Sequence, residues 1–265
     1  AVMPYFQYRE VQAPPGTGPS VMPWDTASIT SHNPSTHPET LFHFPLIDDD
    51  VDEVSAITLD QVSTSSIVVS RGITANTFTR FWGNDASSVL TTHNHSAAGV
   101  LSHETTGLGP FTAAVCVRMP DDTGFAANAY ALTIKSSSGG SAYGISLGTG
   151  NANLGRLVYG PTANVITSGG SIDDGGWHHL AATIDGTTGL ADWTVKFYVD
   201  GVLISTDTSQ PEIATATADL RIHVGSFAGT TSFRFRGNIR SAIGISKALS
   251  DPEVAALSTA TIGSP

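Results

Sequence analysis

The densest set of potential metal ligands lies in the stretch "LIDDDVDEVS". Asp48, Asp50 and Asp52 have the i, i+2, i+4 spacing with which carboxylates open a calcium-binding loop. The similarity ends there, because Glu53 stands where such a loop needs glycine and Leu59 where it needs a bidentate glutamate. A solvated acidic turn accounts for the same residues. We predict calcium as the only cofactor, bound at these three aspartates, with the solvated turn as the alternative.

Hydrolysis of glycosidic bonds is a second chemistry that carboxyl groups could perform. Retaining hydrolysis needs two carboxyls about 5–5.5 Å apart, and alternate residues of one strand supply such a pair because they share a face. The chain has six glutamates, and no two of them lie within ten residues of each other. The sequence therefore predicts that the protein is not an enzyme.

Sugar binding is a third chemistry, for which aromatic rings are the usual platforms. Candidate rings lie on or beside segments that we expect to form strands and turns: Tyr143, Tyr159, Trp193 and Tyr198. Each could stack on a sugar, although large rings more often pack in a core. His178 and His179 in "WHHLAATIDG" are interpreted as packing and hydrogen-bonding residues.

Composition limits the possible partners and compartments. The 265 residues carry a formal net charge of −11 and no basic cluster, which argues against nucleic acid or an anionic membrane as a partner. No apolar run approaches the roughly 18–20 residues of a membrane span, so no membrane insertion is expected. Cys116 is the single cysteine, which excludes an internal disulfide. The first residues have no apolar signal-peptide core, although a signal peptide removed before residue 1 is an alternative.

Residues 1–40 differ from the rest of the chain because they hold seven of its 14 prolines. Proline fixes φ and removes a hydrogen-bond donor, so this segment is expected to be extended. A disordered tail is one alternative. We favour an arm that anchors the protein to a partner through its large apolar residues: Tyr5, Phe6, Tyr8, Val21, Met22 and Trp24.

From residue 41 to 265 the pattern predicts short antiparallel strands. Apolar residues alternate with others in "FTAAVCVRM", "TVKFYVDGVLI" and "DLRIHVGS". In "FRFRGNIRSAIGI" the same alternation places Ile239, Ile243 and Ile245 on one face. Asp200-Gly201 reads as a two-residue hairpin turn. Further strands are expected at 41–46, 65–70, 77–82, 129–135, 143–148 and 155–159. "SDPEVAAL" predicts a helix of about two turns, with Ser250 and Glu253 as a capping box.

Residues 175–257 resemble the C-terminal half of a laminin-G-like, or concanavalin A-like, jelly-roll domain. The matching segments are "GGWHHLAATIDG", "VKFYVDGVLI", "LRIHVGS", "FRGNI" and "KALSDPEVAAL", and the resemblance extends more loosely over 41–258. It implies an all-β antiparallel jelly-roll β-sandwich with one short C-terminal helix, here preceded by the extended N-terminal arm. The family usually has an aromatic residue where Cys116 stands. It also usually has acidic residues where this chain has Arg240 and Ser241.

The resembled family includes glycosidases, lectins, calcium-dependent adhesion modules and viral structural proteins, so the fold does not decide the function. The arm, the missing signal peptide and the missing catalytic pair favour a non-catalytic protein of a virus particle, such as a phage tail, fibre or head-decoration component. It would be made in the host cytoplasm and contact other virion proteins through residues 1–40, in a homo-oligomer or larger assembly. Its jelly roll would bind host cell-surface glycans. The alternatives are a free-standing or secreted extracellular lectin-like module and, third, a glycoside hydrolase.

Overall fold

The structure is a computed structural model. It describes residues 39–44, 60–61, 70–71, 79–81, 90–91, 110–119, 128–136, 144–160, 164–186, 190–210, 220–225, 235 and 237–262. The long strands are β6 (Phe111–Arg118), β7 (Ala129–Ser136), β8 (Gly144–Thr149), β9 (Leu154–Tyr159), β10 (Asn164–Ser171), β11 (Trp177–Asp185), β12 (Trp193–Val199), β13 (Val202–Gln210) and β15 (Gly237–Ile245). The shorter strands are β1 (Thr40–Phe44), β2 (Asp60–Gln61), β3 (Ser70–Arg71), β4 (Thr79–Phe81), β5 (Leu90–Thr91) and β14 (Leu220–Val224). The helical elements are η2 (Asn151–Asn153) and α2 (Asp251–Ile262).

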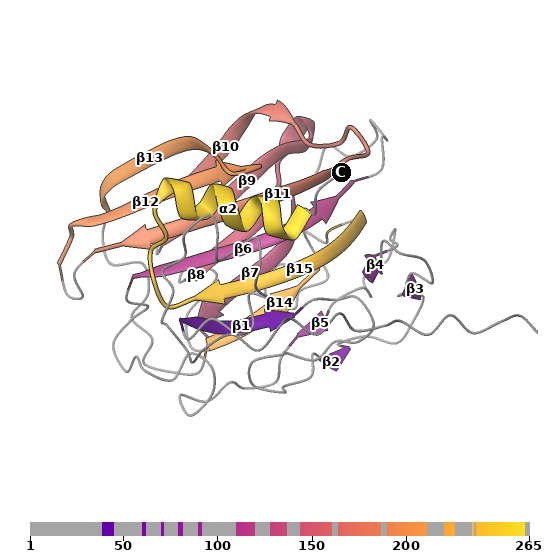
Figure 1. Cartoon of the computed structure of the whole chain (residues 1–265), viewed down its shortest axis with the longest axis horizontal. Helices are drawn as coiled ribbons and strands as arrows, with labels where there is room; N and C mark the ends of the chain where they lie inside the picture. Colours follow the sequence, from indigo (N-terminus) through magenta and orange to yellow (C-terminus); the bar gives the residue numbers. More distant parts are fainter. Residues whose placement is uncertain are drawn as a thin grey trace, which may run out of the picture.

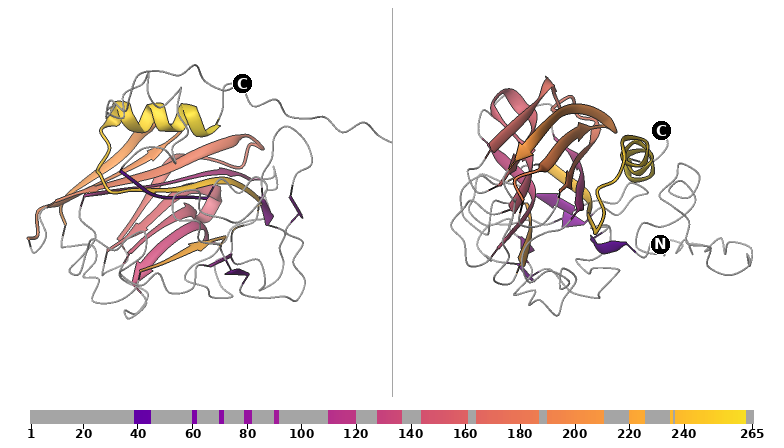
Figure 2. Two further views of the ribbon diagram at one scale, coloured as in Figure 1. Left: turned by 60° about the horizontal axis from the view of Figure 1, so that its bottom comes forward. Right: turned by 90° about the vertical axis from the view of Figure 1, so that its left-hand side faces the viewer.

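The described strands form two antiparallel sheets that face each other (Figure 1). One sheet has eight strands in the order β13-β12-β11-β6-β15-β4-β3, with β1 also paired to β15. The other has seven strands in the order β10-β9-β8-β7-β14-β5-β2. Helix α2 lies on the outer face of the eight-stranded sheet (Figure 2). The predicted fold class, an antiparallel jelly-roll β-sandwich with one C-terminal helix, is confirmed for the described residues.

The main core lies between the sheets and follows the predicted alternation. In β6, Phe111, Val115 and Val117 point inward, and each is at most 1 % exposed. In β12, Val195 and Phe197 join the same cluster, and Val199 packs against it. Burial of these apolar side chains is the main favourable contribution that holds the two sheets together.

A second, smaller core lies between the eight-stranded sheet and α2. It is formed by residues on the opposite faces of the same strands together with the buried side of the helix: Ala114, Ala181, Tyr198, Ile243, Ile245, Leu249, Val254, Ala256 and Leu257. The central strands of this sheet are therefore buried on both faces. In β6 only Arg118 is exposed. The helix thus explains why "FTAAVCVR" is apolar on both faces rather than on one.

Strand β15 departs from the expected alternation. Ile239 pairs with Val117 and Ser241 with Cys116, so Arg240 is an extra residue in the ladder, a β-bulge. The bulge reverses which face each later residue occupies. Ile239 packs between the sheets, whereas Ile243 and Ile245 pack under α2. The expectation that these three isoleucines share one face is therefore wrong.

The predicted helix is present but longer than expected. It runs for 12 residues, which is about three turns rather than two. The carboxylate of Glu253 accepts hydrogen bonds from the backbone N–H and the hydroxyl of Ser250, both at 2.7 Å. Lys247 also pairs with Glu253 at 2.7 Å. The predicted pairing of Ser250 with Glu253 at the helix start is confirmed.

Candidate functional site

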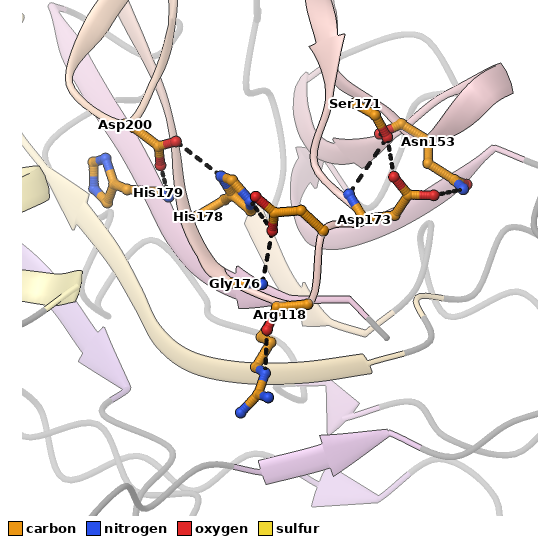
Figure 3. A network of polar contacts seen from close by, with 10 residues as sticks. Arg118, Asn153, Ser171, Asp173, Gly176, His178, His179 and Asp200 are labelled. Atoms are coloured by element: carbon orange, nitrogen blue, oxygen red, sulfur yellow. Dashed lines mark hydrogen bonds and ion pairs between the residues drawn. The ribbon is translucent and has the colours of Figure 1, made fainter. Parts of the chain in front are cut away.

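A network of polar side chains lies at one rim of the sandwich (Figure 3). We call it the rim network and define it by six residues: Asn153, Ser171, Asp173, Asp174, His178 and Asp200. They come from η2, from the end of β10 and its connection to β11, from the start of β11, and from the turn between β12 and β13. Several loops thus bring these side chains to one edge of the sheets.

The turn between β12 and β13 positions the first carboxylate. Asp200 and Gly201 both have positive φ, 53° and 77°, as the predicted two-residue hairpin requires. Asp200 donates its N–H to the carbonyl of His179 at 2.8 Å, and its Oδ1 accepts from the N–H of His179 at 2.8 Å. The turn is therefore fastened to β11, and Oδ2 of Asp200 remains directed at His178.

His178 is held between two carboxylates. Its Nδ1 lies 2.8 Å from Oδ2 of Asp200, and its Nε2 lies 3.0 Å from Oδ1 of Asp174. The hydrogen bond with Asp200 is the main cause that raises the pKa of His178 to about 9, against the opposing effect of burial. A protonated imidazole donates from both nitrogens. At neutral pH His178 is therefore a cationic clamp and not a general base.

Asp173 forms the other half of the rim network. It accepts hydrogen bonds from Nδ2 of Asn153, at 2.5 Å, and from the hydroxyl of Ser171. These two bonds are the main cause of its lowered pKa, so Asp173 stays ionised. Oδ1 of Asn153 is buried and has no hydrogen-bond partner in the described residues. Asn153 itself has φ of 55° and follows Ala152 at 58°, a left-handed pair that a regular strand could not provide.

The connection between β10 and β11 is fastened at two further points. Arg118 donates from Nε to the carbonyl of Gly175 at 2.6 Å, and Asp174 accepts from the N–H of Gly176 at 2.7 Å. The side chain of Asp174 nevertheless stays 66 % exposed. The rim network therefore presents ionised, accessible carboxylate oxygens on a backbone held in place, beside an amide and a hydroxyl. Such a group of acceptors and donors suits a ligand rich in hydroxyl groups.

The neighbouring His179 has the opposite environment. It is fully buried on the helix-facing side of β11, and burial lowers the pKa of its imidazole to about 4. Cys116 is its cross-strand partner, and burial raises the pKa of that thiol to about 12. A protonated, buried thiol is a poor nucleophile. This pair therefore offers no catalytic group.

Two of the residues that depart from the resembled family, Cys116 and Arg240, are neighbours in the structure. Arg240 Nη2 lies 4.0 Å from Sγ of Cys116, and the guanidinium lies over the ring of Trp177, 4.7 Å from its centroid. The same Nη2 donates to the carbonyls of Thr261 and Ile262. Arg240 therefore binds the C-terminal end of α2 to the sheet, where helix carbonyls lack partners within the helix.

The predicted sugar-stacking rings are not at the rim. Trp193 and Tyr198 are 0 % exposed and Tyr159 is 1 % exposed, so none of them presents a ring face to a ligand. Trp193 and Tyr159 fill the main core, and Tyr198 lies under α2 with its hydroxyl 2.8 Å from Asp251. The prediction of sugar binding by these three rings is wrong, because their bulk serves packing. Tyr143 lies outside the described residues.

The other predicted sites also lie outside the described residues. They are the calcium aspartates Asp48, Asp50 and Asp52 and the arm residues Tyr5, Phe6, Tyr8, Val21, Met22 and Trp24. Within the described part of the chain, no three His, Cys, Asp or Glu side chains gather to hold a metal ion. No helix in that part has the length and hydropathy that a membrane crossing requires.

Sequence reasoning missed the rim network. Its signal was present in "SIDDGGWHH", where two aspartates precede the histidines, and in the turn "VDG". The pairing of His178 with Asp200 spans 22 residues and depends on the hairpin turn folding back against β11. A search for partners among residues close in the sequence therefore does not find this contact.

Comparison with known proteins supports the fold. A family described as the concanavalin A-like lectin/glucanases superfamily matches residues 83–255, more than half of the chain. This chain belongs to that superfamily. The comparison with curated proteins found no match.

Among solved structures, domain 4 of AbnA, a GH43 extracellular arabinanase from Geobacillus stearothermophilus in complex with arabinotriose, has a TM-score of 0.57 and 17 % identity. The match covers 83 % of this chain and 98 % of that domain. The botulinum neurotoxin serotype G binding domain has a TM-score of 0.54 and 14 % identity, over 83 % of this chain and 50 % of the other. The binding domain of botulinum neurotoxin DC in complex with SialylT has a TM-score of 0.54 and 14 % identity, over 88 % of this chain and 52 % of the other. This chain thus spans about half of the neurotoxin domains, and at these identities the likeness shows the fold alone.

Proposed function

We propose that this protein is a non-catalytic glycan-binding module and that its rim network binds sugar hydroxyl groups. The observation that carries the proposal is the pair of ionised carboxylates, Asp173 and Asp174, on a connection fastened by Arg118 and His178. Carboxylate oxygens accept hydrogen bonds from sugar hydroxyls, and hydrogen bonds to charged groups are stronger than neutral ones. Because both groups are already held in place, a ligand would cost little further ordering.

The superfamily and its solved members support the same class of ligand. The superfamily's description names lectins and glucanases. Two of the similar structures were solved with a carbohydrate-type ligand, arabinotriose in one and SialylT in the other. We carry over the class of ligand alone, since the identities are 17 % and 14 %.

The rim chemistry supports binding more than hydrolysis. His178 is committed to two carboxylates, and the Ser171 hydroxyl is committed to Asp173. A nucleophile needs a free base within hydrogen-bond reach. A glycosidase acid needs a raised carboxyl pKa, whereas the pKa values of Asp173, Asp174 and Asp200 are all lowered. We propose a binding protein for these reasons.

The finer proposal is that the module is displayed on a virus particle and is attached by residues 1–40. Its support is the sequence of that segment, with seven of the 14 prolines and several large apolar residues. Calcium bound by Asp48, Asp50 and Asp52 is a further prediction of the sequence. A free-standing extracellular lectin-like module is the alternative setting for the same binding site.

A glycan array followed by titration calorimetry on the strongest ligand tests the proposal. Asp173→Asn and Asp174→Asn keep the side-chain shape but remove the charge, and each is expected to weaken binding by about tenfold or more. Asp185→Asn is the matched control, because Asp185 is an exposed aspartate at the opposite end of β11. Reducing-end release from the bound glycan should stay at background. Turnover, or equal losses in all three variants, contradicts the proposal.

A further inference from the structure

The outermost strand of the eight-stranded sheet is unusually open. Every residue of β13 is exposed or partly exposed, and the three apolar residues at its start are all exposed. Val202 is 63 % exposed, Leu203 38 % and Ile204 37 %. In an antiparallel sheet, alternate N–H and C=O groups of an edge strand point away from their one partner. Among the described strands, β12 is the only partner of β13.

Edge strands usually carry features that discourage further pairing, such as lysine, proline or an inward charge. In the sequence "VLISTDTSQ" β13 has neither lysine nor proline. Its one charged residue, Asp207, does point inward, but its carboxylate already accepts a hydrogen bond from the buried hydroxyl of Tyr159 and so is satisfied within the sandwich. Two β-bulges, one at Ile204 and one between Asp207 and Gln210, also discourage pairing locally, but the stretch 205–207 stays in regular register with β12.

The charges at the ends of this edge are acidic. Asp200, two residues before the strand, is 39 % exposed and Asp174 is 66 % exposed; the two carboxylates share one cation, His178, so this end keeps an excess of negative charge. Asp192 lies at the other end, next to the pairing of Trp193 with Gln210. Lys196, a cation on the neighbouring strand β12, is already paired with Asp251 at 2.7 Å. A second copy of this chain, with its net charge of −11, would bring like charges together at the same edge.

We propose that β13 is a docking edge that takes an extended basic segment of a partner protein by antiparallel strand addition. Main-chain hydrogen bonds to the free edge would supply affinity, and apolar side chains of the partner would pack on Val202, Leu203 and Ile204. Lysine or arginine residues near the ends of the added segment would lie against Asp200 with Asp174 at one end and Asp192 at the other. The proposal goes beyond sugar binding, since the edge recognises a peptide backbone, although Asp174 and Asp200 belong to the rim network as well.

The test uses two synthetic eleven-residue peptides that alternate valine and threonine with either lysine or glutamate near both ends. Fluorescence anisotropy measures their binding to the whole protein, and hydrogen exchange locates it. The basic peptide is expected to bind at least about tenfold more tightly than the acidic one. It should slow amide exchange in residues 202–208 selectively.

Surface substitutions give the matched controls. Leu203→Lys removes an apolar contact and repels the basic peptide, so it should weaken binding by at least about tenfold. Leu203→Glu removes the same contact without repulsion and should weaken it less. Val165→Lys alters a residue that is 48 % exposed on the edge strand of the other sheet, and it should change nothing. Both positions are exposed, so the fold should tolerate all three changes.

Four results would overturn the proposal. They are no binding of the basic peptide, equal binding of both peptides, protection outside β13, and self-association through β13 that Leu203→Lys abolishes. The last of these would assign the edge to a second copy of the chain.

Discussion

His178 and His179 are neighbours on β11, and the sheet places them in opposite electrostatic environments. The side chain of His178 is 13 % exposed and bridges Asp174 and Asp200, so its charged form is favoured. His179 is 0 % exposed on the helix-facing side and is kept neutral by burial. A charged group without a partner is costly to bury. The one histidine therefore fastens the rim, and the other fills the space beneath α2.

The stability of the protein should depend on the protonation of His178. Its pKa in the folded state, about 9, lies above the ordinary value of 6.5. Protonated His178 therefore stabilises the fold fully below pH 6.5, and this contribution is lost as the pH rises from 6.5 to about 9. The loss amounts to at most about 3 kcal/mol. Urea unfolding at intervals across this range measures it.

His178→Gln is the matched control for the pH experiment, because glutamine keeps hydrogen-bonding capacity without a titratable proton. The variant should be less stable than the natural protein below pH 6.5 and should show a much flatter profile up to pH 9. Nuclear magnetic resonance titration of the two imidazoles should find one near 9 and one near 4. Two histidines that both titrate near 6.5 would contradict the described rim.

At the scale of elements, polar contacts fasten both ends of α2. Glu253 satisfies the backbone N–H of Ser250 at the start, and Arg240 binds the carbonyls of Thr261 and Ile262 at the end. Arg240 reaches the helix because the bulge in β15 places it between Ile239 and Ser241. A positive charge near the C-terminus of a helix also interacts favourably with the helix dipole. The bulge in β15 therefore supplies the side chain that binds the C-terminal end of α2.

Arg240→Ala should detach the end of α2 without unfolding the sandwich. It removes two charge-assisted hydrogen bonds and the contact with Trp177, and the expected loss of stability is about 2–4 kcal/mol. Amide exchange should accelerate in residues 257–262 more than in β6. Arg240→Lys keeps the charge and should recover part of the loss. Unchanged exchange in the helix of the alanine variant would show that Arg240 does not hold it.

The strands that follow simple alternation could be predicted from the sequence, and β6, β12 and β14 were placed correctly because period-2 burial leaves a direct pattern. The reversal in β15 could not be predicted, since a bulge depends on pairing with β6 and leaves no pattern of its own. The rim network escaped prediction for a similar reason: Asp200 reaches His178 only after the hairpin folds back. Trp193 and Tyr198 were open to two interpretations in the sequence, because an aromatic ring that could stack on a sugar could equally pack in a core, and both rings are buried.

At the scale of the whole molecule, the jelly roll is closed by its own early segment. The backbone carbonyl of Glu39 accepts hydrogen bonds from the backbone N–H and the hydroxyl of Ser246, and Thr40 pairs with Ile245. The contacts of the sandwich therefore already include Glu39, two residues before the boundary expected from the sequence. A test of the proposed arm should leave Glu39 and Thr40 in place.

Removal of residues 1–38 should leave a folded jelly roll and abolish incorporation into the parent particle. The reason is that the predicted anchoring residues all lie in this segment, whereas the contacts of β1 with β15 are kept. Thermal unfolding measures the first effect, and co-sedimentation with particles measures the second. A truncated protein that still joins the particle, but melts at a much lower temperature, would show that the segment belongs to the sandwich.

The central claim is that sugars bind at the rim, and chemical-shift mapping with the strongest glycan from the array tests it most directly. In a titration of isotope-labelled protein, the largest amide shifts should fall at residues 153 and 171–176, with smaller ones at 200–201. They should disappear in Asp173→Asn and persist in Asp185→Asn. Shifts that cluster instead on the seven-stranded sheet, where Arg156 of β9 lies over the ring of Tyr130 of β7, would place the binding site elsewhere and contradict the account.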